Sequence, residues 1–201
     1  MIKYLQPNFY HFSQDPILLA QFASERINNS FSNRNFNLID MCCGCGVSGL
    51  EMIQRLPSVR SRLKKVIFIE KQLEFLSFIE KNINNFKVDQ TPVEIFINSL
   101  PHLDSAEITF LICNPPFYID GQGRKSGNNQ KDQCSFMEQG QAKKIIDWMV
   151  EIKKVLDGEF FFMFILPINS FWLEMFRETN FQIKVNKLSE FPQREIISNI
   201  Y

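Results

Sequence analysis

"NLIDMCCGCG", residues 37–46, is the stretch that decides the fold. Its first half is mostly apolar, which is typical of a short buried strand over 37–42. Its second half contains Gly44 and Gly46, and glycines allow a tight turn in which the backbone closely approaches a ligand. The residues at 48–56 then favour a helix. This order of strand, turn and helix is the first unit of a parallel α/β sheet.

The rest of the chain repeats this alternation. Apolar runs predict further strands at 65–70, 93–98, 108–113, 159–166, 181–188 and 194–200. Helical spacing predicts helices over 16–29, 72–85, 139–157 and 169–179, with Asp15 as the N-cap of the first and Gly158 at the C-cap of the third. We therefore predict an α/β, Rossmann-like, doubly wound fold with a mostly parallel seven-stranded sheet and helices on both faces.

Composition limits the classes of protein that the chain can form. With 201 residues, 45% of them hydrophobic, we expect one domain over 1–201 with a helical lead-in over 1–36. The formal net charge is zero, which excludes a strongly basic nucleic-acid-binding surface over the whole chain. No signal peptide and no long apolar span is recognisable, so we expect no membrane partner. The odd count of five cysteines does not suit a disulfide framework and favours the cytoplasm.

Three of these cysteines crowd into the turn, and Cys42 and Cys45 form a C-x-x-C pair. A structural zinc needs about four ligands, and the remaining cysteines and the histidines lie far away in sequence. A redox dithiol is the other reading of such a pair. We favour small packing residues and expect no metal.

A second informative stretch is "FLICNPPFY", residues 110–118. Its strand must end at the prolines, which donate no hydrogen bond to a sheet. The side-chain carbonyl of Asn114 and the backbone carbonyl of Pro115 can accept both hydrogens of a planar NH2 group, and Phe117 offers a face for stacking. We predict that Asn114, Pro115, Pro116 and Phe117 form a catalytic group. The alternative is an ordinary diproline turn that ends a strand.

An acidic residue, Glu70, ends the second predicted strand. A carboxylate there can accept hydrogen bonds from two ribose hydroxyls, which points to a nucleotide-like ligand. The dinucleotide pattern G-x-G-x-x-G is not met, because position 42 is Cys. This departure argues against a nicotinamide cofactor.

Taken together, "DMCCGCG" (40–46), Glu70 and "NPPF" (114–117) resemble class I S-adenosylmethionine-dependent methyltransferases, in particular amino methyltransferases with an (Asn/Asp)-Pro-Pro-aromatic motif. "YHFSQDPILLAQFA" (10–23) resembles the element before the cofactor turn in bacterial tRNA1(Val) adenine-N6 methyltransferases. The resemblance implies S-adenosyl-L-methionine as cofactor, bound by Asp15, Asp40, Cys42, Gly44, Gly46, Glu70, Asn98 and Ser99. Cys42 replaces the family's usual first Gly, and Asn98 and Ser99 stand where the family often has an Asp.

The resemblance also implies methylation of the N6 amino group of adenine in structured RNA such as tRNA. The long segment 118–138 is then a substrate loop, with Phe117, Tyr118, Arg124 and Lys125 contacting the substrate. Alternatives are a ribosomal RNA guanine-N2 or adenine-N6 methyltransferase and a protein glutamine N5-methyltransferase. A cofactor-binding relic that serves as an RNA-binding or assembly module is a further, non-enzymatic alternative.

Overall fold

The computed structural model describes residues 3–31, 33–55, 60–86, 91–102, 107–119, 121, 124–168 and 170–200. Positions 32, 56, 120, 122, 123 and 169 of the predicted segments, and the two ends of the chain, lie outside these residues. Within the described ranges, no helix has the length and apolar character needed to cross a membrane.

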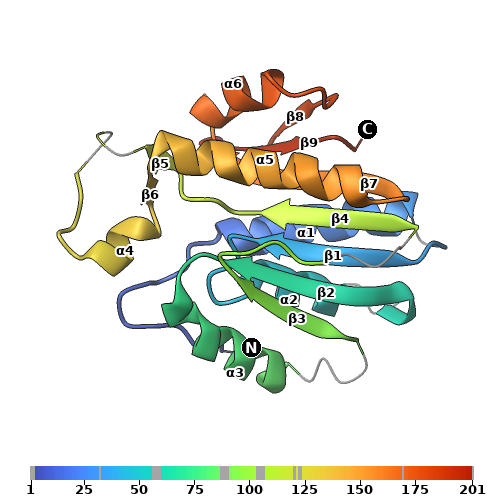
Figure 1. Ribbon diagram of the computed structural model, residues 1–201, viewed down its shortest axis with the longest axis horizontal. Helices are drawn as coiled ribbons and strands as arrows, with labels where there is room; N and C mark the ends of the chain where they lie inside the picture. Colours follow the sequence, from blue (N-terminus) through green and yellow to red (C-terminus); the bar gives the residue numbers. More distant parts are fainter. Residues whose placement is uncertain are drawn as a thin grey trace.

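The predicted seven-stranded sheet is confirmed, with strand order β3-β2-β1-β4-β7-β9-β8 (Figure 1). The strands from β3 to β7 run parallel, and β9 is antiparallel to both of its neighbours. The bounds are β1 Phe36–Met41, β2 Leu63–Glu70, β3 Val93–Ile97, β4 Ile108–Cys113, β7 Glu159–Pro167, β8 Lys184–Lys187 and β9 Arg194–Ser198.

Helices cover both faces of this sheet and create two separate cores. One core joins the sheet to α1 (Asp15–Ser30), α2 (Val47–Arg55) and α3 (Leu76–Asn85). The other joins it to α5 (Gln139–Val155) and α6 (Phe171–Arg177). Neighbouring residues of β1 divide between the two, Leu38 in the first core and Ile39 in the second. This is why the central strands are apolar along their whole length.

Two predicted helix caps are wrong. Helix α1 begins at Asp15 itself, and its N-cap residue Gln14 makes no side-chain cap hydrogen bond. The Asp15 carboxylate instead pairs with Arg194, a partner that local sequence does not reveal. Helix α5 ends at Val155 with Leu156 as C-cap, so Gly158 belongs to the turn before β7. Two short 3-10 helices, η1 (Arg60–Arg62) and η2 (Leu73–Phe75), precede β2 and α3, and η2 replaces the start of the helix predicted at 72.

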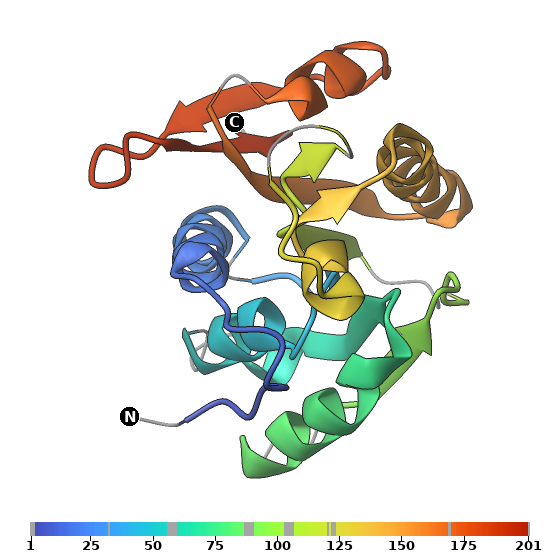
Figure 2. The same cartoon turned by 90° about the vertical axis from the view of Figure 1, so that its left-hand side faces the viewer.

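The segment 118–138, predicted to be irregular, contains regular structure. Strands β5 (Tyr118–Ile119) and β6 (Phe136–Met137) pair in parallel, and α4 (Asn129–Gln133) lies between them in sequence. Asn128 caps α4 by accepting a hydrogen bond from the Lys131 amide at 3.1 Å. Asp132 accepts hydrogen bonds from the Ser126 amide, the Ser126 hydroxyl and the Gly127 amide. In Figure 2 this segment lies in front of the arrowhead ends of the central strands.

Close packing of α2 on β1 depends on Gly49. A Cβ atom built at position 49 would lie 2.7 Å from Phe68 Cε1 and 3.1 Å from Asp40 Oδ2. Phe68 and Asp40 are both fully buried, so neither can move aside. Without a side chain at Gly49, the helix approaches the strand closely enough for its amide to reach Asp40.

We predict that Gly49→Ala lowers the free energy of unfolding by about 1–3 kcal/mol, because overpacking forces buried groups apart. Gly140→Ala is the matched control, since a Cβ at Gly140 in α5 meets no atom of the described residues within 4 Å. It should be neutral or slightly stabilising. Chemical denaturation of both variants is the measurement, and equal stabilities would contradict the packing argument.

Candidate active site

A cavity of about 310 Å³ opens beyond the carboxyl ends of β1, β2 and β4. Ligands of open α/β sheets bind at this edge, and the volume is at the small end of the range for small-molecule sites. Six residues predicted for the site line the cavity: Cys42, Gly44, Glu70, Asn98, Asn114 and Pro116. The structure thus brings the glycine turn, the acid of β2 and the NPPF motif to one place.

The turn after β1 is built on left-handed backbone conformations. Gly44 and Gly46 have φ angles of 54° and 80°, which glycine adopts freely. Cys42 has a φ angle of 57°, in a region that is unfavourable for a residue with a Cβ atom. A glycine would be relaxed at this position, so the cysteine imposes strain on the turn. The amide of Gly46 donates to the Cys43 carbonyl at 2.8 Å and closes the turn.

Asp40 lies behind the turn and not in the cavity. Its side chain is fully buried, and Oδ2 accepts a hydrogen bond from the Gly49 amide at 2.7 Å. Burial raises the pKa of Asp40 to about 7, against the opposing effect of the Gly49 amide. Oδ1 is buried with no hydrogen-bond partner. Asp40 therefore supports the turn from below through one of its two carboxylate oxygens.

Glu70 faces the turn from the end of β2. Its Oε2 accepts the Gly44 amide at 2.8 Å, and its Oε1 accepts the Lys71 and Gln72 amides at 2.8 and 2.9 Å. Burial raises the pKa of Glu70, and these three amides oppose the rise. A carboxylate has about four acceptor positions, so one remains for a hydroxyl group of a ligand.

Asn114 lines the cavity and has an unused side-chain acceptor. Its Oδ1 is buried and has no hydrogen-bond partner, although the residue lines the cavity. Gln72, also at the cavity, has a second buried acceptor of this kind in its Oε1 atom. Leaving a buried acceptor unpaired costs about 1–3 kcal/mol. A ligand N–H donor that reached either oxygen would relieve that cost.

The other predicted site residues lie outside the cavity lining. Pro115 and Gly46 are buried, and Asp15 forms an ion pair with Arg194. The Phe117 ring lies beneath the Arg194 guanidinium, 4.8 Å from ring centroid to Cζ. The remaining four are exposed on the surface: Ser99, Tyr118, Arg124 and Lys125.

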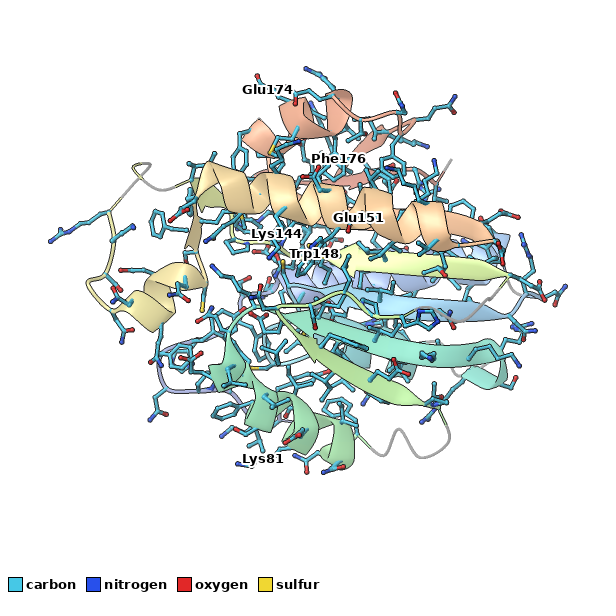
Figure 3. All side chains as sticks on the ribbon, viewed as in Figure 1. Lys81, Lys144, Trp148, Glu151, Glu174 and Phe176 are labelled. Atoms are coloured by element: carbon cyan, nitrogen blue, oxygen red, sulfur yellow. The ribbon has the colours of Figure 1, made fainter. Side chains whose placement is uncertain are left out.

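Sequence reasoning missed several residues that line the cavity: Tyr10, Gln72, Phe75, Cys134, Lys144 and Trp148. Lys144 and Trp148 lie on α5 beside the strand arrowheads (Figure 3), with the Lys144 amine 4.7 Å from the Trp148 ring. The same amine donates to Asn98 Oδ1 at 3.4 Å. Their spacing of four residues on a helix was the available signal, but it indicated only a shared face. In the part of the chain that the structure describes, no group of acidic, His or Cys residues is arranged to hold a metal ion.

Sequence comparison identifies the family. The profile of the methyltransferase small domain matches residues 15–130, more than half of the chain, so the chain belongs to this family. It is a class I S-adenosylmethionine-dependent methyltransferase. No protein of curated function matches the chain by sequence.

Solved structures show the same fold at low sequence identity. The catalytic domain of human Mettl16 in complex with the MAT2A 3′UTR hairpin 1 has a TM-score of 0.63 at 13% identity, over 96% of this chain and 72% of that one. Precorrin-6y C5,15-methyltransferase from Geobacter metallireducens has a TM-score of 0.56 at 12% identity, over 97% and 91%. Ribosomal protein L11 methylase from Lactobacillus delbrueckii has a TM-score of 0.56 at 12% identity, over 92% of this chain and 78% of that one.

The cavity suits S-adenosylmethionine, the cofactor of this family. The free acceptor position on Glu70 fits a ribose hydroxyl, and the unpaired oxygen of Gln72 fits a donor group. Gly44 leaves room for the ligand, since among the residues that the structure describes only Tyr10 and Phe75 lie within 4 Å of a Cβ built there. The chemistry of these groups therefore matches a ligand that has a ribose and polar N–H and O–H groups.

We predict that Cys42→Gly is more stable than Cys42→Ala by about 1 kcal/mol, because only glycine relaxes at a φ angle of 57°. Both variants remove the thiol, so the comparison isolates the backbone. Urea unfolding of the two proteins is the measurement. An alanine variant as stable as the glycine variant would show that position 42 is unstrained.

Asp40 should make stability depend on pH. The unfolded carboxyl loses its proton near pH 3.8 and the folded one near pH 7, so its contribution to stability is full below the first value and disappears as pH rises through the second. Relative to Asp40→Asn, which does not titrate, the cofactor-free protein should lose up to about 4 kcal/mol across this range. The free energy of unfolding of both proteins, measured between pH 4 and pH 8, tests the predicted direction of this change. Parallel curves of unfolding free energy against pH would contradict it.

Proposed function

We propose that this methyltransferase transfers the methyl group to the nitrogen of an exocyclic amine, and that the amine is N6 of adenine in a structured RNA such as tRNA. The observation that supports amine chemistry is the buried, unpaired Oδ1 of Asn114 at the cavity. An acceptor without a donor at this place suits a substrate that brings an NH2 group. The chain would act as a single domain.

Asn114 and Pro115 would hold the amine by its two hydrogens. With both hydrogens bound, a pyramidal nitrogen would be favoured, so its lone pair would be released from conjugation with the ring for attack. When bound, the cofactor would supply a sulfonium methyl group for transfer to this nitrogen; the electron pair of the broken C–S bond would stay on sulfur and the amine would lose one proton to water. Much of the catalysis would come from positioning the two reactants.

An RNA substrate is favoured by the surface next to the cavity. Arg124, Lys125 and Lys131 are exposed on the segment that lies in front of the carboxyl ends of the strands (Figure 2). Cationic side chains at this place can contact phosphates, although the net charge of the chain is zero. The similarity to a Mettl16 domain solved with an RNA hairpin agrees with this substrate class.

The test is transfer of a labelled methyl group to separate tRNA, ribosomal RNA and protein fractions, followed by nucleoside analysis of the product. We expect label on N6 of adenine in tRNA. Label on guanine N2 in ribosomal RNA would keep the amine chemistry and change the base, and label on a glutamine amide would change the substrate class. Cofactor binding without transfer to any fraction would favour a non-catalytic binding module.

We predict that Asn114→Ala lowers kcat by about 100-fold or more, because the amine loses a hydrogen-bond acceptor that positions it. Its affinity for the cofactor should change little. Asn114→Asp keeps an acceptor oxygen and should retain more activity than the alanine variant. Single-turnover rates and calorimetric cofactor titrations separate these effects, and an equal loss of both quantities would contradict the proposed role of Asn114.

A further inference from the structure

Asp15, Arg194 and Phe117 form a connected group beside the cavity. Arg194 at the start of β9 makes a bidentate pair with Asp15 at the start of α1, with Nε–Oδ1 at 2.8 Å and Nη2–Oδ2 at 3.2 Å. The Ser13 hydroxyl donates to the same Oδ2 atom at 2.8 Å. The guanidinium held in this way lies over the Phe117 ring, 4.8 Å from its centroid. Three distant parts of the sequence thus meet at the aromatic residue of the NPPF motif.

The geometry fixes the guanidinium more firmly than a surface ion pair does. The Asp15 side chain is only 8% exposed and the Arg194 side chain 22%, so water weakens their attraction less than it would at the surface. A forked guanidinium bound at two points has little freedom to leave the ring face. Phe117 itself is only partly buried, so part of the ring is accessible while Arg194 covers one side.

We propose that Arg194 is a positioning residue: clamped by Asp15, it holds the Phe117 ring in the orientation against which the substrate base stacks. This inference rests on the proposed function, since it concerns the ring that would receive the amine-bearing base. It also gives Asp15 a different role from the cofactor contact that the family resemblance implies. Asp15 acts through Arg194 on the substrate side, and the cofactor does not depend on it.

The competing explanation is a structural staple, by which we mean that the Asp15–Arg194 ion pair only stabilises the contact between α1 and β9. A staple would contribute stability but would have no specific coupling to Phe117. The two explanations therefore differ in what happens to the aromatic ring, and in whether the effect of an Arg194 substitution depends on the residue at position 117.

The first experiment needs no substrate. Crystal structures of Arg194→Gln and of the unaltered protein are determined, and the number of orientations of the Phe117 ring is compared between them. Arg34→Gln is the matched control, since it breaks another arginine ion pair, with Glu107 and Glu159, that involves neither α1 nor the NPPF motif. We expect several ring orientations only in Arg194→Gln, or in Arg194→Lys if the first variant does not fold. A single, unchanged ring orientation would overturn the proposal, whatever the substrate is.

The second experiment is kinetic. We expect Arg194→Gln to reduce kcat/KM for the methyl acceptor about tenfold while cofactor affinity is unchanged, and Asp15→Asn to act in the same way. Arg194→Lys should restore part of the loss. In a Phe117→Leu background, Arg194→Gln should have little further effect, because the ring that it positions is gone.

Additive losses in this double-mutant cycle would support a staple and overturn the proposal. Weaker cofactor binding by Asp15→Asn would also overturn it, by returning Asp15 to the cofactor. If the unaltered protein methylates none of the fractions, the proposed function fails, and the order of the Phe117 ring still decides the role of Arg194.

Discussion

The register of the central parallel strands is the constraint on which the site depends. Met41 of β1 pairs with Ile69 of β2 on one side and with Cys113 of β4 on the other. The residues that follow these three, Cys42, Glu70 and Asn114, must therefore meet at one edge of the sheet. A shift of one residue in either pair would turn the buried side chains to the wrong core, so burial on both faces enforces the register.

The hydrogen bonds of Glu70 then make the edge rigid. Glu70 binds the Gly44 amide of the first turn and the first two amides after its own strand. It therefore holds the backbone on both sides of the cavity before any ligand arrives. Asp40 does the same beneath the turn through the Gly49 amide. Two buried acids thus shape the backbone of the site, and the apolar cores behind them limit its motion.

Periodicity in the sequence was sufficient to predict most of the fold. The apolar strands and the amphipathic helices follow from local patterns, and the positions after the strand ends predicted which residues would share an edge. Local patterns could not predict the contacts between distant elements. The Asp15–Arg194 pair spans 179 positions, and the position of Asp15 beside Pro16 suggested a helix cap instead. Asn128 and Asp132 likewise order a segment whose polar composition indicated only a loop.

Sequence patterns predicted cavity-lining residues that follow a strand end, and they missed residues whose place at the cavity depends on packing. The amide of Asn114 and the carboxylate of Glu70 have few other uses at the end of a buried strand, so their placement was informative. Lys144 and Trp148 reach the cavity only because α5 packs on the β4 side at a particular rotation, which the helical pattern leaves undetermined. The same reasoning explains Phe117: its identity suggested stacking, but only the folded chain shows that a clamped guanidinium covers one side of the ring. A motif thus predicts which residue types lie at the strand ends, while the elements packed around them determine how those side chains are held.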